Sequence, residues 1–234
     1  MPRTANIVRL EKMARHLRPL LDEVVFLGGC TTEIFVTDAG AAEVRPTTDV
    51  DVVIEVASLI QYFDFAERLR NIGFQEDSSD GAPRCRWLID GAQLDVMPTH
   101  EEILGFSNPW YETAMESAQE YVLGADLTIR TITAPYFIAT KLVAFRNRGK
   151  NDYQASSDLE DIIAVLDGRA AIVDEIRKQK ETVRSYLAKE MADLMETSAF
   201  RDALPGYVEQ DPASQARVAI IEDRIEQIAK LRVI

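Results

Sequence analysis

The chain is poor in the residues on which several common protein classes depend. Of its 234 residues, two are cysteine and two are histidine. Cys30 and Cys85 are too few and too far apart for a zinc ligand set, and we expect both to be buried thiols of a reducing compartment. His16 and His100 alone disfavour histidine-dependent hydrolysis. The motifs Gly-x-Ser-x-Gly and Gly-x-x-x-x-Gly-Lys do not occur, which disfavours α/β-hydrolase and P-loop chemistry.

Basic residues are outnumbered by acidic ones. The chain has 26 Lys and Arg against 39 Asp and Glu, a formal net charge of −13. This balance disfavours a broad nucleic-acid-binding surface, although a local basic groove remains compatible with it. No stretch approaches the roughly 20 apolar residues of a membrane span, and residues 1–21 lack the apolar region of a signal peptide. The sequence predicts a soluble, cytoplasmic protein with no membrane partner.

The order of the predicted elements divides the chain in two. Apolar and β-branched runs predict strands at 24–27, 49–55, 84–89, 93–97, 120–123 and 127–132, with helices at 6–21, 58–72 and 110–118. Residues 31–36 suit a helix or a strand, and 38–46 are typical of a loop. Helical patterns follow at 136–148, 157–166, 171–179, 182–197 and 212–231. We predict an α+β fold: a mixed sheet with flanking helices over 1–132 and an all-helical C-terminal part over 133–234.

Two aspartates stand one residue apart at the head of the predicted strand 49–55. Because side chains alternate along a strand, Asp49 and Asp51 point to the same face. Neighbouring carboxylates repel each other unless a cation neutralises them, and Mg²⁺ prefers oxygen ligands of this kind. By itself, the pair indicates a metal site and an acidic strand edge equally well.

Two further features suit the same chemistry. Gly28-Gly29 ends the first strand, where it makes a tight turn whose backbone N–H groups can hold phosphate oxygens, or a tight turn only. Asp95 lies between apolar neighbours on its strand and points away from them, toward an active face or toward solvent. Three carboxylates on adjacent strands beside such a turn are typical of metal-assisted phosphoryl or nucleotidyl transfer.

These stretches resemble a known signature. The order Leu27-Gly28-Gly29, Thr48-Asp49-Val50-Asp51-Val52 and Leu94-Asp95-Val96 is similar to that of the polymerase-β-like nucleotidyltransferase superfamily. The resemblance implies a nucleotidyltransferase core in which Mg²⁺ or Mn²⁺ is bound by Asp49, Asp51 and Asp95. It also implies that an NTP substrate is contacted by the turn and its neighbours, with Gly28, Gly29, Thr31 and Thr48 as candidates. Cys30 stands where many members carry a serine, so Thr31, Thr32 or the backbone would make that contact.

A second resemblance lies in the helical part. The AbiEii/AbiGii toxin-type nucleotidyltransferases carry a lysine followed by a Lys-Asp-x-x-Asp motif. This chain is similar there: it has Lys141, then the basic residues Arg146, Arg148 and Lys150, then Asp158-Leu159-Glu160-Asp161. Ser157 stands in place of the usual basic residue of the motif. The resemblance implies that Lys141 contacts nucleotide phosphate and that Asp158 and Asp161 support the site. It also implies a toxin paired with an antitoxin protein, and an acceptor such as tRNA or protein.

The residues leave a second interpretation open. Lys141 is also typical of a solvated helix position, and Asp158 and Asp161 are favoured in a first helical turn by the helix dipole. The basic residues 146–150 are either an RNA-facing patch or a basic helix end. A non-catalytic nucleotide- or partner-binding module on the same fold is therefore the alternative. The presence of all three candidate carboxylates favours an enzyme that transfers NMP from NTP to RNA or protein.

Overall fold

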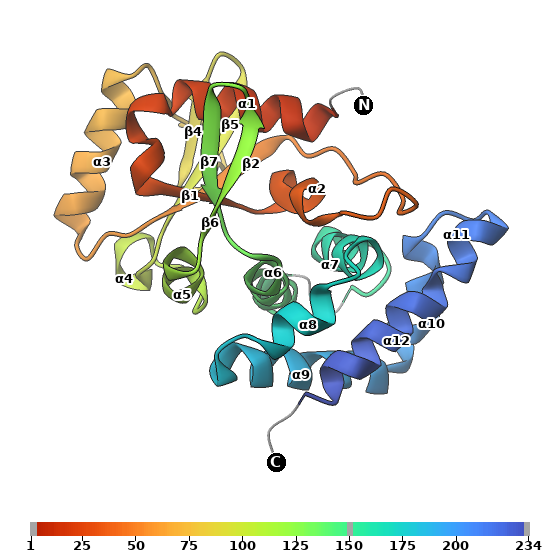
Figure 1. The fold of residues 1–234 in the computed structure, drawn as a ribbon. Helices are drawn as coiled ribbons and strands as arrows, with labels where there is room; N and C mark the ends of the chain where they lie inside the picture. Colours follow the sequence, from red (N-terminus) through yellow and green to blue (C-terminus); the bar gives the residue numbers. More distant parts are fainter. Residues whose placement is uncertain (1–3, 149–151, 232–234) are drawn as a thin grey trace. The chain divides into compact units, whose positions relative to one another are not determined.

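The computed structural model describes residues 4–148 and 152–231, which form two compact units (Figure 1). The first unit comprises Met1–Glu33 and Arg45–Thr133, and the second comprises Ile34–Val44 and Ala134–Ile234. Strands dominate the first unit and helices the second. The grouping of Ile34–Val44 with the helices was not expected from the sequence, and the division at residue 132 stays a prediction.

A mixed sheet forms the centre of the first unit. Within the described residues it has seven strands in the order β3-β4-β5-β2-β1-β7-β6. The pairs β2–β5 and β1–β7 are parallel and the other neighbours are antiparallel. The predicted α+β fold class is confirmed. The strands are β1 (Val24–Leu27), β2 (Asp49–Ile54), β3 (Gln75–Glu76), β4 (Arg86–Ile89), β5 (Ala92–Pro98), β6 (Gln119–Gly124) and β7 (Leu127–Thr131).

The helices of the first unit flank this sheet. They are α1 (Ala5–His16), η1 (Arg18–Glu23), η2 (Gly29–Thr31), α3 (Leu59–Asn71), α4 (Glu101–Leu104) and α5 (Tyr111–Glu116), with α2 (Thr32–Phe35) at the change from one unit to the other. The first helix packs against β2, β5, β6 and β7. Its predicted extension to residue 21 is wrong, because Pro19 has no N–H to continue an α-helix and a 3₁₀-helix follows instead.

Seven described helices and one 3₁₀ turn build the second unit. They are α6 (Ala134–Arg148), α7 (Ser157–Gly168), α8 (Ile172–Arg177), α9 (Glu181–Glu196), α10 (Ser198–Ala203), η3 (Leu204–Tyr207), α11 (Pro212–Ala216) and α12 (Val218–Ala229). α6 and α12 each pack against α7, α8 and α9. The prediction of a single helix over 212–231 is wrong, because the helix is interrupted at Arg217 and forms α11 and α12. The helix α10 was not predicted.

The segment Ile34–Val44 closes the C-terminal end of α7. The Gly168 carbonyl accepts hydrogen bonds from the N–H groups of Thr37 at 2.8 Å and Asp38 at 2.9 Å. A helix leaves its last carbonyls without intrahelical partners, so these bonds satisfy an otherwise unpaired group. Arg217 Nη2 donates to Asp38 Oδ2 at 2.7 Å. The predicted loop is confirmed, and its partner is the helical unit.

Three local features of the structure follow from composition and turn chemistry. Cys30 and Cys85 are free and buried, as predicted, and burial raises the pKa of each thiol to about 12. The β4–β5 hairpin turns at Asp90 and Gly91, whose φ angles of 47° and 72° suit a two-residue type I′ turn. Within the described residues, no helix combines the length and apolar character needed to cross a membrane.

Candidate functional site

One row of paired residues crosses four strands of the sheet. Asp51 on β2 is in register with Leu27 on β1 and with Asp95 on β5, and Asp95 is in register with Arg86 on β4. Asp49 lies two residues before Asp51 and therefore on the same face. The structure thus brings the three predicted carboxylates to neighbouring positions on two central strands.

Arg86 belongs to this group although no sequence motif includes it. Its Nε donates to Asp95 Oδ1 at 2.8 Å, and its Nη2 donates to Asp95 Oδ2 at 2.8 Å and to Asp49 Oδ2 at 3.1 Å. The hydrogen bonds to Asp95 raise the pKa of Arg86, so the guanidinium stays charged. A two-residue hairpin at Asp90-Gly91 fixes the β4–β5 register, and counting back from that turn would have placed Arg86 opposite Asp95.

Gly28, directly after β1, makes a close approach to Asp51. Its φ is +76° and its ψ −173°, a conformation that side chains other than glycine strongly disfavour. A Cβ atom at this position would lie 1.8 Å from Asp51 Oδ2. Any larger residue would therefore displace the carboxylate. The contact predicted between Gly28 and nucleotide phosphates stays a prediction.

Gly28→Ala is expected to lower the free energy of unfolding by about 2–3 kcal/mol, because it combines backbone strain with a clash against Asp51. Urea denaturation of the purified chain measures the loss. Gly91→Ala is the control: its φ is also positive, at +72°, but nothing lies within 4 Å of the added Cβ. Equal losses in the two variants would contradict a close contact between residue 28 and Asp51.

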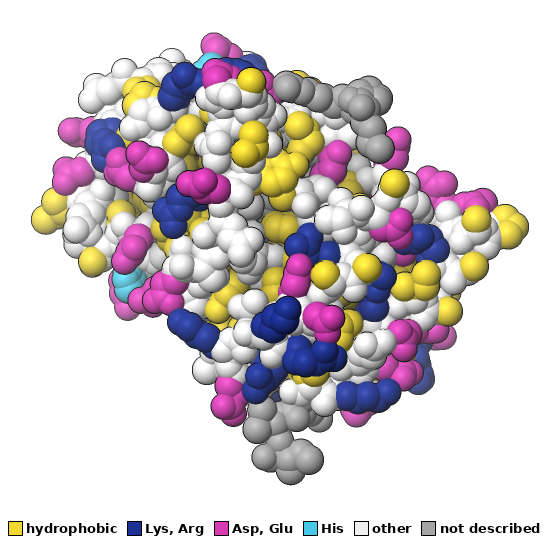
Figure 2. Space-filling model, viewed as in Figure 1, with side chains coloured by type: hydrophobic (Ala, Val, Ile, Leu, Met, Phe, Trp, Pro, Cys, Tyr) yellow, Lys and Arg dark blue, Asp and Glu magenta, His cyan; other side chains and the backbone are white. Residues whose placement is uncertain are grey.

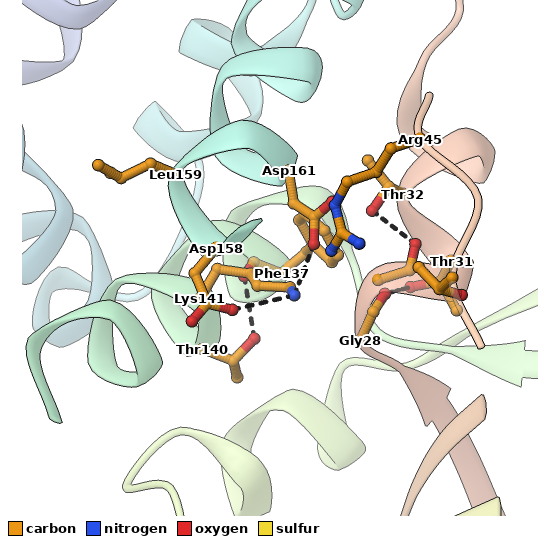
Figure 3. A network of polar contacts seen from close by, with 12 residues as sticks. Gly28, Thr31, Thr32, Arg45, Phe137, Thr140, Lys141, Asp158, Leu159 and Asp161 are labelled. Carbon is orange, nitrogen blue, oxygen red and sulfur yellow. Dashed lines mark hydrogen bonds and ion pairs between the residues drawn. The ribbon is translucent and has the colours of Figure 1, made fainter. Parts of the chain in front are cut away.

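The turn that follows β1 is held by its own threonines. The Thr31 N–H and hydroxyl donate to the Gly28 carbonyl at 3.0 and 2.8 Å (Figure 3), and the Thr32 hydroxyl donates to the Gly29 carbonyl at 2.8 Å. Both threonine side chains are buried. These bonds stabilise the turn, and the nucleotide-binding roles predicted for Gly29 and Thr31 stay predictions.

Asn6 on α1 ties this turn to the segment before β2. Its Oδ1 accepts from the Thr47 N–H at 3.0 Å, its Nδ2 donates to the Arg45 carbonyl at 2.9 Å, and its own carbonyl accepts from Cys30 Sγ at 3.5 Å. Thr47 is buried, whereas Thr48, the predicted nucleotide contact, is exposed. Sequence motifs missed Asn6 and Thr47, since neither is marked by local spacing.

Two of the predicted carboxylates, Asp49 and Asp51, suit a divalent cation as a pair of ligands. Within the described parts of the chain, no group of three or more His, Cys, Asp or Glu side chains is placed to hold a metal ion. The Arg86 guanidinium bridges two of the three predicted carboxylates, Asp95 and Asp49. Mg²⁺ is commonly held by one or two carboxylates together with substrate phosphates. By donor chemistry, Asp49 and Asp51 fit that role.

The other predicted residues form an ion-pair network within the second unit (Figure 3). Lys141 Nζ on α6 lies 3.1 Å from Asp158 Oδ1 and 2.6 Å from Asp161 Oδ2, both on α7. The three side chains are 9%, 4% and 1% exposed. Aspartates three residues apart share one helix face, so both reach the same ammonium group. The structure brings these three together, with Lys141 ion-paired to both aspartates.

Arg148 extends this network from the end of α6. Its Nε and Nη2 donate to the two carboxylate oxygens of Asp158 at 3.0 and 2.9 Å. Burial opposes the charge on Asp158, but the hydrogen bond from Arg148 and the positive charges of Lys141 and Arg148 outweigh it and hold the pKa of Asp158 below its usual value. Asp158 is therefore an ionised, strongly paired carboxylate.

The basic residues predicted as an RNA-facing patch have partners in their own unit. Arg146 Nε donates to Glu190 Oε2 at 2.8 Å, and Arg148 is paired with Asp158. Lys150 lies outside the described residues. Figure 2 shows basic and acidic side chains interspersed over the helices of this unit on the face drawn. The two described arginines of the predicted patch are thus neutralised locally.

No protein-family model and no curated protein matches the chain. Solved structures do resemble it. JHP933 from Helicobacter pylori is 12% identical, with 97% of this chain and 93% of that chain covered and a TM-score of 0.49. A candidate nucleotidyltransferase from H. pylori is 10% identical, with 96% and 93% covered and a TM-score of 0.45.

Proposed function

We propose that the chain is a nucleotidyltransferase that moves a nucleoside monophosphate from an NTP to an acceptor hydroxyl and releases pyrophosphate. The observation that carries the proposal is the placement of Asp49, Asp51 and Asp95 on one face of β2 and β5, with the Gly28 turn against Asp51. Side-by-side carboxylates beside a turn that begins with glycine suit metal-assisted nucleotidyl transfer.

The three carboxylates, Gly28 and Arg86 have separate roles in this reaction. Asp49 and Asp51 would hold Mg²⁺ or Mn²⁺, which when bound neutralises charge on the triphosphate. Gly28 leaves room for the Asp51 carboxylate, and Asp95, fixed by Arg86, accepts a hydrogen bond from the acceptor hydroxyl and orients it. The acceptor oxygen bonds to the α-phosphorus as the bond from that phosphorus to the bridging oxygen breaks. Pyrophosphate leaves with that oxygen, and the hydroxyl proton passes to solvent.

The acceptor is proposed to be RNA, such as tRNA, or protein, and the biological role that of a toxin with an antitoxin partner. Both are supported by the resemblance of Lys141 and Asp158–Asp161 to the motifs of the AbiEii/AbiGii toxin-type nucleotidyltransferases. The net charge of −13 and the local pairing of Arg146 and Arg148 favour a protein acceptor over tRNA.

The proposal is tested by a transfer assay with the purified chain. Each of the four α-³²P-labelled NTPs is incubated with Mg²⁺ and either total RNA or total protein from cell extract. We expect label from at least one NTP to enter one of the two fractions, and we expect chelation of the divalent cation by EDTA to abolish this incorporation. If no NTP labels RNA, protein or the chain itself, the proposed activity is wrong.

One observation favours a non-catalytic nucleotide- or partner-binding module as the second candidate. Arg86 already neutralises Asp49 and Asp95 within the chain, so part of the carboxylate set is satisfied without an added cation. Calorimetry separates the two candidates. NTP binding that is independent of Mg²⁺ and survives Asp51→Asn would favour the module, whereas binding that needs both would favour the enzyme.

A further inference from the structure

The Arg86 guanidinium is shared between the two strands that carry the aspartates. Two parallel hydrogen bonds of 2.8 Å join it to Asp95, and the same Nη2 reaches Asp49 Oδ2 at 3.1 Å. The side chains of Arg86, Asp49 and Asp95 are 19%, 32% and 10% exposed, so water screens these contacts less than it would screen a surface pair.

The two contacts differ in strength. A bidentate, charge-assisted pair holds both the position and the orientation of a carboxylate, as Arg86 does for Asp95. The contact with Asp49 is longer and uses one nitrogen that Asp95 already engages. It is therefore the contact that a competing cation displaces first.

A divalent cation bound to Asp49 would stabilise the same negative charge that the Arg86 guanidinium stabilises. Two cations that draw on one carboxylate oxygen compete, and their positive charges also repel each other at this separation. Binding of one is thus coupled unfavourably to the presence of the other.

We propose that Arg86 is a positioning residue that fixes Asp95 and competes with a divalent cation for Asp49. The inference rests on the proposed function only in taking Asp49 and Asp51 as the cation-binding pair. Arg86 holds Asp49 and Asp95 together against their mutual repulsion. When a cation binds, Arg86 releases Asp49 and keeps Asp95.

The inference is tested by binding of Mn²⁺ alone to the full chain, followed by electron paramagnetic resonance. Arg86→Met is expected to bind Mn²⁺ about tenfold more tightly than the wild type, because a competing charge is removed. Arg86→Lys keeps the charge but cannot form the planar fork, and is expected to tighten binding about threefold. Arg68→Met is the control, since Arg68 pairs with Glu23, which directly precedes the opposite end of β1, and this variant should bind Mn²⁺ as the wild type does.

Unchanged or weaker Mn²⁺ binding in Arg86→Met would overturn the inference. If Arg86→Met does not fold, the Mn²⁺ affinity of Arg86→Lys is the test. An affinity equal to or below that of the wild type would then overturn the inference. The outcome is distinguishable from failure of the proposed function. If Arg86→Met binds Mn²⁺ more tightly but the wild type transfers no nucleotide, the proposed function is wrong and the competition for Asp49 stands. If the wild type transfers nucleotides but Arg86→Met binds Mn²⁺ with unchanged affinity, the competition is wrong and the proposed function stands.

Discussion

Asp51→Asn is expected to reduce nucleotidyl transfer by about 10³-fold or more, because the variant removes one charge of the cation-binding pair and with it several kcal/mol of transition-state stabilisation. Asparagine has nearly the shape of aspartate, so the side chain still fits against Gly28. The space there is tight, because a Cβ atom added to Gly28 would lie 1.8 Å from Asp51 Oδ2. The loss should therefore appear in activity and not in folding. Initial rates of label transfer from the preferred NTP measure it.

The matched control is Asp80→Asn, which removes one negative charge from an exposed loop of the same unit. It should retain wild-type transfer. Growth arrest on overexpression adds a readout in cells, since a toxin role predicts arrest by the wild type and by Asp80→Asn but not by Asp51→Asn. Transfer by Asp51→Asn at the wild-type rate would remove this carboxylate from the proposed site.

The local features of the site were predictable because short-range rules govern them. Alternation along β2 places Asp49 and Asp51 on one face, and the Asp90-Gly91 turn fixes which residues of β4 and β5 face each other. The same register would have revealed Arg86 as the partner of Asp95. A motif of carboxylates at fixed spacing includes Asp49, Asp51 and Asp95 but not Arg86, the arginine that pairs with Asp49 and Asp95.

Features that depend on contacts between distant segments were not predictable. Asn6 holds the segment before β2 across 41 residues of sequence, and no local pattern distinguishes buried Thr47 from exposed Thr48. The break between α11 and α12 falls at Arg217, whose side chain reaches Asp38 and Asp167. Hydrophobic periodicity continues through that break because it reports a buried face and not the partners that end a helix.

Lys141→Met is expected to lower the free energy of unfolding by about 3–5 kcal/mol, the cost of removing one partner from a buried ion-pair network. Methionine keeps the length and apolar stem of lysine, so the loss reports the charge rather than a cavity. Asp158 and Asp161 would then face each other with the ammonium group gone. Lys189→Met is the control in the same unit: Lys189 pairs with Asp193 on an exposed turn of α9, and its loss should cost less than about 1 kcal/mol.

The pH dependence of this deficit identifies its cause. The pKa of Asp158 is lowered in the folded chain, so its ion pairs stabilise the fold above the unfolded-state pKa of about 3.9 and lose that effect as the pH falls through the folded-state value. The difference between wild type and Lys141→Met should be complete near neutral pH and shrink below about pH 4. Urea denaturation across this range measures it. A deficit that stays constant as the carboxylates protonate would mean that the ammonium group stabilises the unit through its contact with the Phe137 ring, whose centroid lies 5.9 Å from the ammonium nitrogen, rather than through the two carboxylates.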